Sequence, residues 1–396
     1  MAMTSASPPA SAVEANRLGI AALQAGNFGE AVDRFEAAIA ADPASGALLR
    51  NLASAWRALN DPAQEIAALD AALALDRRDL MAWIRKAERH EALDARGAAL
   101  AAWSAAVALG GQLDPPPPPI APLLAHGQAF IDEATGGMFA AASEAFAAMR
   151  DSLDETERRR GEAFIGSALG RRRIYQNACA GIYYPFLPAD EFFDRRHFPW
   201  IGEIEAQTAA IRAELEALLA DPGEALRPYV RMEAGTPDSI WTGLDNRLDW
   251  GACFLWEYGD PNRAVLDRCP ATAAALAAVP GAHIPGRAPS AFFSMLKPRT
   301  RIPPHTGVTN TRAIVHLPLI VPPGCGFRVG GETRAWEEGK AFAFDDTIEH
   351  EAWNDSDDLR AVLIFDVWNP HLTAGEREVL LRYFASADAS GYAIPR

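Results

Sequence analysis

The stretch Ile314-Val-His-Leu-Pro-Leu-Ile-Val321 decides how the last third of the chain folds. It is an apolar, β-branched run between Gly- and Pro-rich segments, which is typical of a buried strand. Runs of the same kind occupy residues 253–256, 291–296 and 361–367. Many short strands separated by turns predict a β-sandwich or jelly roll.

Shorter elements surround these runs. Residues 326–330 and 336–342 extend the strand pattern, the second as strand, turn and strand, and Trp336 is expected to be a core aromatic. A helix is expected over residues 373–386, because Thr373 can serve as N-cap and Glu376 as its capping-box partner. A further helix is expected over residues 201–219.

The first 110 residues have a different pattern, a repeat of 34 residues in units that start at Ala12, Gly46 and Leu80. Each unit has small residues at its eighth and twenty-seventh positions and a large apolar residue at its twenty-fourth. These positions are Gly19, Ala53 and Ala87; Ala38, Ala72 and Ala106; and Phe35, Leu69 and Trp103. The pattern is that of tetratricopeptide repeats, helical hairpins that stack into a superhelix. Glu65 replaces the usual alanine and is expected to weaken the second unit.

The predicted organisation is an α+β multidomain chain. The repeats occupy residues 12–112, and five consecutive prolines mark residues 113–122 as an extended linker. Residues 123–174 read as a helical connector, and residues 175–396 as the β-domain.

Composition limits the partners and the location of the protein. The chain has 396 residues and a formal net charge of −15, which argues against binding to nucleic acid or to anionic membranes. No apolar run approaches the roughly 20 residues that span a bilayer, and residues 1–12 lack the pattern of a secretory signal. The four cysteines form no Cys-x-x-Cys pair, which favours reduced thiols. We therefore expect a cytoplasmic protein.

Two histidines carry the chemistry. His305 and His350 lie 45 positions apart, each beside a strand-like segment, and Arg360 follows the second by ten residues. Neutral imidazole is the commonest metal ligand near pH 7. Two histidines and one carboxylate form the non-haem iron triad, which leaves positions open for a cosubstrate and oxygen.

The residue two places after the first histidine is Gly307, where such triads often carry the carboxylate. Either the site is inactive, or two histidines suffice and water fills the third position. Asp345 and Asp346 lie near His350 in sequence, in a tight turn. They are candidates for turn residues and, less favoured, for metal ligands.

The residues around the histidine pair form an ordered set of motifs. These are Ser294-Met-Leu-Lys-Pro298, Pro304-His-Thr-Gly307, Thr309-Asn-Thr-Arg312, His316-Leu-Pro-Leu319, Glu332-Thr-Arg-Ala-Trp-Glu-Glu-Gly339, Phe344-Asp-Asp-Thr-Ile-Glu-His-Glu351 and Asp366-Val-Trp-Asn-Pro370. Together they resemble the aspartyl/asparaginyl β-hydroxylase family over residues 175–370. The resemblance implies a double-stranded β-helix that uses Fe(II), 2-oxoglutarate and O2. Glycine at position 307 is normal in that family, and tetratricopeptide-like helices also precede the oxygenase domain there.

The resemblance also implies roles for single residues. His305 and His350 would hold the iron. Arg360 would bind the distal carboxylate of 2-oxoglutarate, which a guanidinium suits geometrically, and Ser294 would donate a hydrogen bond to the same group. Further cosubstrate contacts are implied for Trp250 and His316.

Substrate binding is implied for Arg312, at the family position that grips an acidic side chain. The chain departs from the family at two places nearby. Ile314 replaces an arginine near the cosubstrate, and Asp245 stands where a further substrate arginine is expected, with Arg247 as a possible substitute. Both departures concern the substrate more than the reaction.

The sequence thus predicts a dioxygenase that converts 2-oxoglutarate to succinate and hydroxylates a substrate side chain. The favoured target is the β-carbon of Asp or Asn in a peptide or protein, presented by the concave face of the repeats. One alternative is a non-catalytic scaffold whose repeats bind a partner. Another is an oxygenase acting on a small molecule or a lipid headgroup. The joint presence of His305, His350, Ser294 and Arg360 argues against the scaffold.

Overall fold

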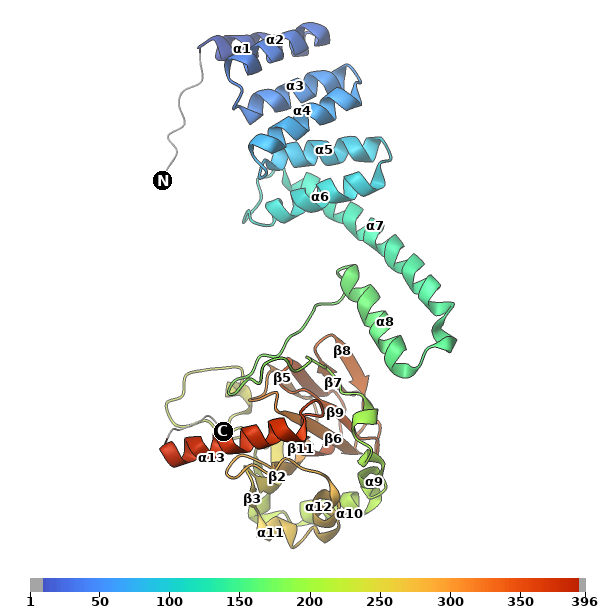
Figure 1. The fold of residues 1–396 in the computed structure, drawn as a ribbon, viewed down its shortest axis with the longest axis vertical. Helices are drawn as coiled ribbons and strands as arrows, with labels where there is room; N and C mark the ends of the chain where they lie inside the picture. Colours follow the sequence, from blue (N-terminus) through green and yellow to red (C-terminus); the bar gives the residue numbers. More distant parts are fainter. Residues whose placement is uncertain (1–9, 392–396) are drawn as a thin grey trace. The chain divides into compact units, whose positions relative to one another are not determined.

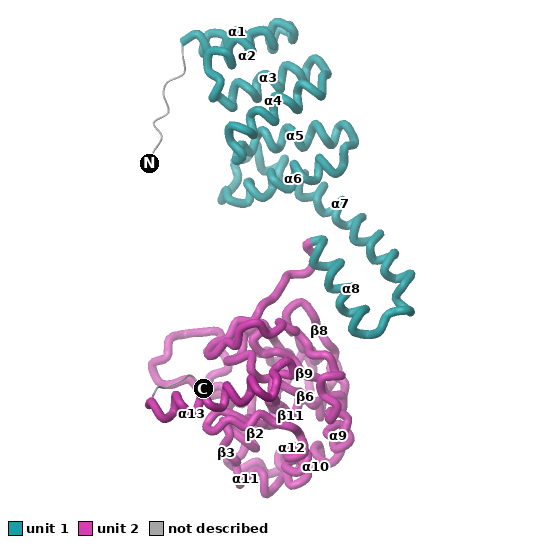
Figure 2. The backbone as a smooth tube through the Cα atoms, in the orientation of Figure 1, with its two compact units in different colours: residues 1–169 teal, residues 170–396 magenta. Residues whose placement is uncertain are grey.

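The computed structural model describes residues 10–391, so most of the segment examined above for a secretory signal lies outside the described residues. The chain forms two compact units, Met1–Leu169 and Gly170–Arg396 (Figure 2). Among the described residues, no helix combines the length and apolar content that crossing a membrane requires. The four cysteines are free thiols.

The first unit begins with three helical hairpins (Figure 1). Their helices are α1 Ala10–Gln24, α2 Phe28–Ala41, α3 Gly46–Ala58, α4 Pro62–Leu75, α5 Leu80–Ala92 and α6 Arg96–Gly110. The small and large apolar positions of the 34-residue pattern are all buried. The prediction of tetratricopeptide-like repeats is therefore confirmed.

Close packing explains the small residues. A Cβ atom on Gly19 would lie 2.7 Å from the Phe35 ring, well inside van der Waals contact. The two helices of the first hairpin can approach only because this position has no side chain.

Glu65 shows how the second repeat accommodates an acid. The side chain is 1% exposed, and its carboxylate accepts a hydrogen bond of 2.5 Å from Arg89 Nε on the next repeat. Burial raises the pKa of Glu65, although Arg89 and Arg57 oppose the shift. The expected weakness is thus offset by an ion pair between repeats.

The proline-rich segment differs from the predicted extended linker. Residues 111–120 form turns and bends, and α7 (Ala121–Ala147) packs directly on α6. A Cβ atom on Gly127 would overlap the Trp103 ring at 2.5 Å, so this contact is close. Apolar residues of α7 cover the last repeat, because its outer face would otherwise be left in water. The unit ends with a 3-10 turn, Arg150–Ser152, and α8, Glu155–Ala168.

The second unit contains two antiparallel sheets. The larger has the order β1-β2-β4-β11-β6-β9, with β3 paired to β2, and the smaller has the order β5-β10-β7-β8. The strands are β1 Arg227–Pro228, β2 Trp250–Glu257, β3 Asp260–Pro261, β4 Ala291–Leu296, β5 Thr300–His305, β6 Arg312–Ile320, β7 Cys325–Val329, β8 Glu332–Ala335, β9 Phe342–Phe344, β10 His350–Asn354 and β11 Arg360–Trp368. From β4 to β11 the chain passes back and forth between the sheets, which is the order of a jelly roll.

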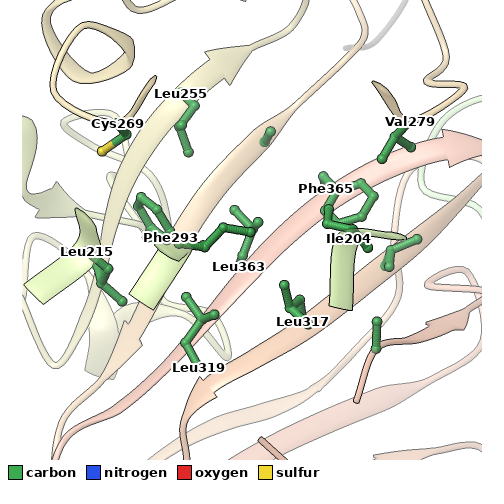
Figure 3. Close-up of a cluster of buried hydrophobic side chains, with 14 of the residues drawn as sticks. Ile204, Leu215, Leu255, Cys269, Val279, Phe293, Leu317, Leu319, Leu363 and Phe365 are labelled. Carbon is green, nitrogen blue, oxygen red and sulfur yellow. The ribbon is translucent and has the colours of Figure 1, made fainter. Parts of the chain in front are cut away.

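Helices cover the outer face of the larger sheet. Figure 3 shows Phe293, Leu317 and Leu363 of this sheet in one apolar cluster with Leu215 and Ile204 of the helices. The helices of the unit are α9 Ile201–Glu205, α10 Thr208–Ala220, α11 Arg263–Leu266, α12 Pro270–Ala278 and α13 Ala374–Ser390, with 3-10 turns at Arg195–His197, Gly223–Ala225 and Thr242–Leu244. With its outer face covered, the sheet turns its inner face toward the smaller sheet.

Most of the predicted elements are present, and the structure adds short strands, β10 among them, that were not predicted. The capping box of Thr373 and Glu376 forms as expected. The helix predicted over 201–219 is broken into α9 and α10, and β8 ends before Trp336. Strand β5 was not predicted because it contains Pro303 and Pro304. Its place at the edge of the smaller sheet tolerates them, since an edge residue can lack a donor.

The Glu65–Arg89 pair gives a test of the first unit. Replacing Arg89 with Leu leaves a buried carboxylate without its partner, and such losses cost about 3–5 kcal/mol. The pKa of Glu65, already raised, should rise further, so the folded state favours the protonated acid and the variant should lose stability as pH rises. Hydrogen exchange of α4 and α5 in the full chain, measured at about pH 5 and pH 8, should show a larger deficit at the higher pH.

A matched control is Arg34→Leu, which removes an exposed pair with Glu30. It should change local stability by less than about 0.5 kcal/mol. A pH-independent loss in Arg89→Leu, or a loss equal to that of Arg34→Leu, would contradict the ion-pair account.

Candidate active site

A cavity of about 400 Å³ lies between the two sheets. The larger sheet lines it with residues of β2, β4, β6 and β11, and the smaller sheet with both histidines. One end holds Arg360 and Ser294, and the other holds Arg312 and Asp366. The predicted site residues are therefore gathered in one space.

Strand pairing brings the two histidines together. His305 ends β5 and His350 begins β10, and the antiparallel register sets them directly opposite each other. Their ring centroids are 4.1 Å apart. Residues opposite each other in a ladder point to the same face of the sheet. The two imidazoles therefore reach the cavity as a pair.

Each imidazole is fixed by a local hydrogen bond. His305 Nδ1 lies 2.8 Å from the carbonyl oxygen of Pro303, and His350 Nδ1 lies 3.0 Å from that of Ile348. A proton on Nδ1 satisfies these contacts and leaves Nε2 as the ligating atom. Burial lowers the pKa of His305, and burial together with the neighbouring His305 lowers the pKa of His350 to about 3. Both rings are thus neutral at physiological pH.

Gly307 and Asp346 share the space beside the pair. The Gly307 N–H donates to the Asp346 carbonyl oxygen at 2.6 Å, and a Cβ atom on residue 307 would overlap the Asp346 carboxylate. Burial, and then the neighbouring Asp345, raise the pKa of Asp346 to about 7. The turn between β9 and β10 therefore places the Asp346 carboxylate next to Gly307. This carboxylate fills the space that a side chain at position 307 would occupy.

The two aspartates of this turn have different environments. The Asp345 carboxylate accepts hydrogen bonds from Thr347 N–H at 3.0 Å and from Asn177 Nδ2 at 2.7 Å, as a turn residue does. Asp346 lines the cavity instead. Among the described residues, no group of three or more His, Cys, Asp or Glu side chains is arranged to hold a metal ion. The potential metal donors that strand pairing brings together here are the two imidazoles.

Arg360 is a buried cation without an anionic partner among the described residues. The residue is 1% exposed, and Nη1 makes only long contacts of 3.3 and 3.4 Å to Ser294 Oγ and its carbonyl oxygen. Its Nε lacks a hydrogen-bond partner, and burial lowers the pKa of Arg360 to about 10. An unpaired buried charge costs several kcal/mol. A ligand carboxylate at this end would remove that cost.

Aromatic and polar groups surround the guanidinium. The guanidinium carbon lies 4.9 Å from the centroid of the Trp336 ring. The His316 ring stacks on Trp336, with the two ring centroids 5.4 Å apart. Trp250 Nε1 donates to Ser294 Oγ at 3.1 Å. Burial, and then Arg360, lower the pKa of His316 well below its ordinary value. Trp336, predicted as a packing residue, thus also contacts the cation.

Arg312 lies at the opposite end and already has partners. Its Nη1 forms an ion pair with Asp366 and donates to the Arg287 carbonyl oxygen at 3.2 Å. Ile314 lines the cavity. Asp245 faces away in its own turn, where it accepts the Met232 N–H at 2.7 Å.

Arg247, the possible substitute for a substrate arginine, is not among the cavity-lining residues. Its side chain is 62% exposed and pairs with Asp249 at 2.5 Å. The structure therefore supplies no substitute at this place.

A strap from the start of the second unit supports the histidine loops. Backbone N–H groups of Ala178, Ala180 and Gly181 donate to carbonyl oxygens of Thr347, Gly307 and Val308 at 2.8, 3.0 and 2.9 Å. Sequence reasoning missed this contact because the partners lie far apart along the chain.

Residues 205–370 match the sequence profile described as Aspartyl/Asparaginyl beta-hydroxylase. The second unit is similar to this family over these residues. The mouse aspartyl/asparaginyl beta-hydroxylase is 41% identical over 139 residues, which cover 35% of this chain and 18% of that protein. The ornithine lipid ester-linked acyl 2-hydroxylase of Rhizobium tropici is 38% identical over 190 residues, 47% of this chain and 63% of that protein. The chain thus spans less than two thirds of the length of these curated relatives.

The chain is also similar to solved tetratricopeptide domains. One is the first such domain of Spaghetti bound to an HSP90 peptide, with 24% identity, a TM-score of 0.27, and coverage of 30% of this chain and 91% of that one. Another is a domain of yeast Sti1 in complex with an Hsp70 peptide, with 23% identity, a TM-score of 0.29, and coverage of 31% and 98%.

The overlap at Gly307 gives a test of the site's packing. Gly307→Ala should displace the Asp346 carboxylate and lower the free energy of unfolding by about 1–3 kcal/mol, as overpacking does. Adding Asp346→Ala should restore part of the loss. Thermal denaturation of the metal-free chain, followed by tryptophan fluorescence, measures both.

Gly375→Ala in α13 is the control, because a Cβ atom there meets nothing within 4 Å. It should be neutral or stabilising by up to about 1 kcal/mol. If Gly307→Ala and this control have the same midpoint of thermal denaturation, the claim that the Asp346 carboxylate excludes a side chain at position 307 is wrong.

Proposed function

We propose that the second unit is an Fe(II)- and 2-oxoglutarate-dependent hydroxylase. The observation that carries the proposal is the joint presence, in one cavity, of two neutral imidazoles and a buried arginine without an anion. The imidazoles suit a divalent metal, and the arginine suits a carboxylate. The similarity to a hydroxylase family supports the same reaction class.

The donor set fits the metal and the cosubstrate. His305 and His350 would hold Fe(II), which when bound supplies the activation of O2. Asp346 places a carboxylate beside this pair, which suits hydrogen bonding to metal-bound water. Of the two alternatives that Gly307 leaves open, we therefore favour a site in which two histidines hold the metal over an inactive site.

The Arg360 end would bind the distal carboxylate of 2-oxoglutarate. The guanidinium supplies the charge and Ser294 Oγ a hydroxyl, while Trp250 orients that hydroxyl through its N–H. In the balanced reaction, 2-oxoglutarate, O2 and a substrate C–H group yield succinate, CO2 and a C–OH group. One oxygen atom enters each of succinate and the alcohol.

A non-catalytic scaffold is less well supported. A domain that only bound a partner would have no use for an unpaired cation at 1% exposure, which destabilises the fold. For the first unit we propose that the stacked repeats bind a polypeptide on their concave face. We further propose that the protein acts in the cytoplasm.

The relatives' names describe two substrate classes. One curated relative is named for aspartyl and asparaginyl groups, and another for the ester-linked acyl group of a lipid. Both names describe a hydroxylated carbon that is bonded directly to a carbonyl carbon, namely Cβ of Asp or Asn and C2 of an acyl group. The residues at the outer end of the cavity distinguish these classes, as argued below.

The test is an anaerobic titration of the metal-free chain with Fe(II) and then with 2-oxoglutarate. Chelation of the metal by a 2-oxo acid should produce a visible charge-transfer band, and admission of O2 should release succinate. A chain that binds Fe(II) but gives neither the band nor succinate would refute the proposal.

Arg360→Ala should spare iron binding and weaken 2-oxoglutarate at least about thirtyfold, since truncating one partner of a buried charge pair costs 2 kcal/mol or more. Arg301→Ala is the control, because that side chain is 61% exposed and pairs with Asp355. Equal cosubstrate affinity in the two variants would remove Arg360 from the binding site.

A further inference from the structure

The side chains that the larger sheet turns toward the cavity change from polar to apolar and back to polar along each strand. On β11 they run from Arg360 through Ile364 to Asp366. On β4 they run from Ser294 to Phe292, and Ser290 continues the row just before the strand begins. Alternate residues of a strand face the same side. The cavity thus has a polar inner end, an apolar middle and a polar outer end.

The apolar middle is a continuous aromatic and aliphatic wall. Phe254 and Ile364 are the two neighbours of Phe292 in the register. The rings of Phe254 and Phe292 stack with centroids 4.9 Å apart, and Tyr229 lies 5.3 Å from Phe292. Phe254, Phe292 and Ile364 offer no polar side-chain atom to a ligand.

The outer end holds charges that are already paired. Arg312 is bound to Asp366, and Glu257 pairs at 2.5 Å with Arg227. Among the described residues that line the cavity, the cations are Arg312 and Arg360. Arg360 belongs to 2-oxoglutarate in the function proposed above, so no cation remains for a carboxylate on the substrate.

Acids outnumber cations along the same wall. Asp346, Asp366 and Glu257 all line the cavity. Ile314, where the resemblance leads us to expect an arginine, lies opposite Asp366 in the β6–β11 register. An acidic side chain here would find Arg312 already paired with Asp366, so its charge would lose water without gaining a counter-ion, which disfavours its binding.

From this wall we infer that the group hydroxylated is an uncharged hydrocarbon chain of the acyl type, and not the acidic side chain of a polypeptide. The inference rests on the proposed function, because it assigns Arg360 to the cosubstrate. Reaction at the β-carbon of a peptide would bring backbone amides among Phe254, Phe292 and Ile364, where they lose water without gaining partners. A methylene chain carries no such groups, and burying it is favourable. The step replaces one methylene C–H with C–OH and takes one oxygen atom of O2, while the other enters succinate.

A matched set of probes tests the inference on the full chain loaded with Mn(II) and 2-oxoglutarate without O2. The probes are octanamide, the half-amide of octanedioic acid, N-acetylaspartate methylamide and N-acetylleucine methylamide. Trp241 and Trp250 line the cavity, so quenching of tryptophan fluorescence reports binding. Octanamide should bind at least tenfold more tightly than each of the other three. With Fe(II) and O2 it should also gain one oxygen atom by mass spectrometry.

Two variants should change the preference. Ile314→Arg adds a cation opposite Asp366, and Asp366→Asn releases Arg312 from its partner. Each should tighten binding of the half-amide at least tenfold, and Ile314→Arg should weaken octanamide by a similar factor. The control is Val379→Arg on α13, where the side chain is 60% exposed and both affinities should stay unchanged.

Each remaining outcome has a defined meaning. If the aspartate probe binds as tightly as octanamide, the inference is wrong. If the leucine probe binds more tightly than octanamide, the apolar wall binds a polypeptide side chain, and the inference of an acyl-type substrate is wrong. If octanamide fails to bind while 2-oxoglutarate binds normally, the substrate class is wrong and the proposed function survives. If 2-oxoglutarate itself does not bind, the proposed function fails and the inference fails with it.

Discussion

The pairing of β5 with β10 is the constraint on which the site depends. It sets His305 opposite His350, and a slip of one residue would turn one imidazole to the other face of the sheet. The carbonyl oxygens of Pro303 and Ile348 then hold each ring through Nδ1. The strap at residues 178–181 ties the loops around both strands to the start of the unit. Backbone hydrogen bonds thus define the position of the proposed metal before any metal binds.

The second constraint is the unpaired guanidinium of Arg360. Burying a charge without a counter-ion lowers the stability of the free protein, and a bound carboxylate would restore it. The neighbouring Ser294, Trp250 and Trp336 are all buried. The inner end of the cavity is therefore organised for an anion, whereas the outer end at Arg312 and Asp366 is neutralised internally. Under the proposed function, this contrast would place the cosubstrate and the substrate in different electrostatic environments within one cavity.

The second unit therefore has the residues that the proposed reaction class needs. It differs from the resembled family in a residue of the cavity wall near the proposed substrate. The histidine pair, Ser294 and Arg360 lie at the inner part of the jelly roll, where register and burial fix them. Ile314 lies toward the outer part, opposite Asp366, and its apolar side chain stands where the resemblance leads us to expect a cation.

The sequence by itself determined the repeats, the principal strands and the capped final helix, because these depend on periodicity and on contacts only a few residues apart. It also pointed to both histidines, Ser294 and Arg360 through their motifs. Strand β5 was not predicted because it contains two prolines. They are tolerated only because the strand lies at the edge of its sheet, which the sequence does not show. Only the tertiary structure decided that Glu65 is paired with Arg89, that Asp346 and not Asp345 faces the histidines, and that Arg312 is bound to Asp366. The physical reason is that the partner of a charge is chosen by packing between distant segments, which no local pattern records.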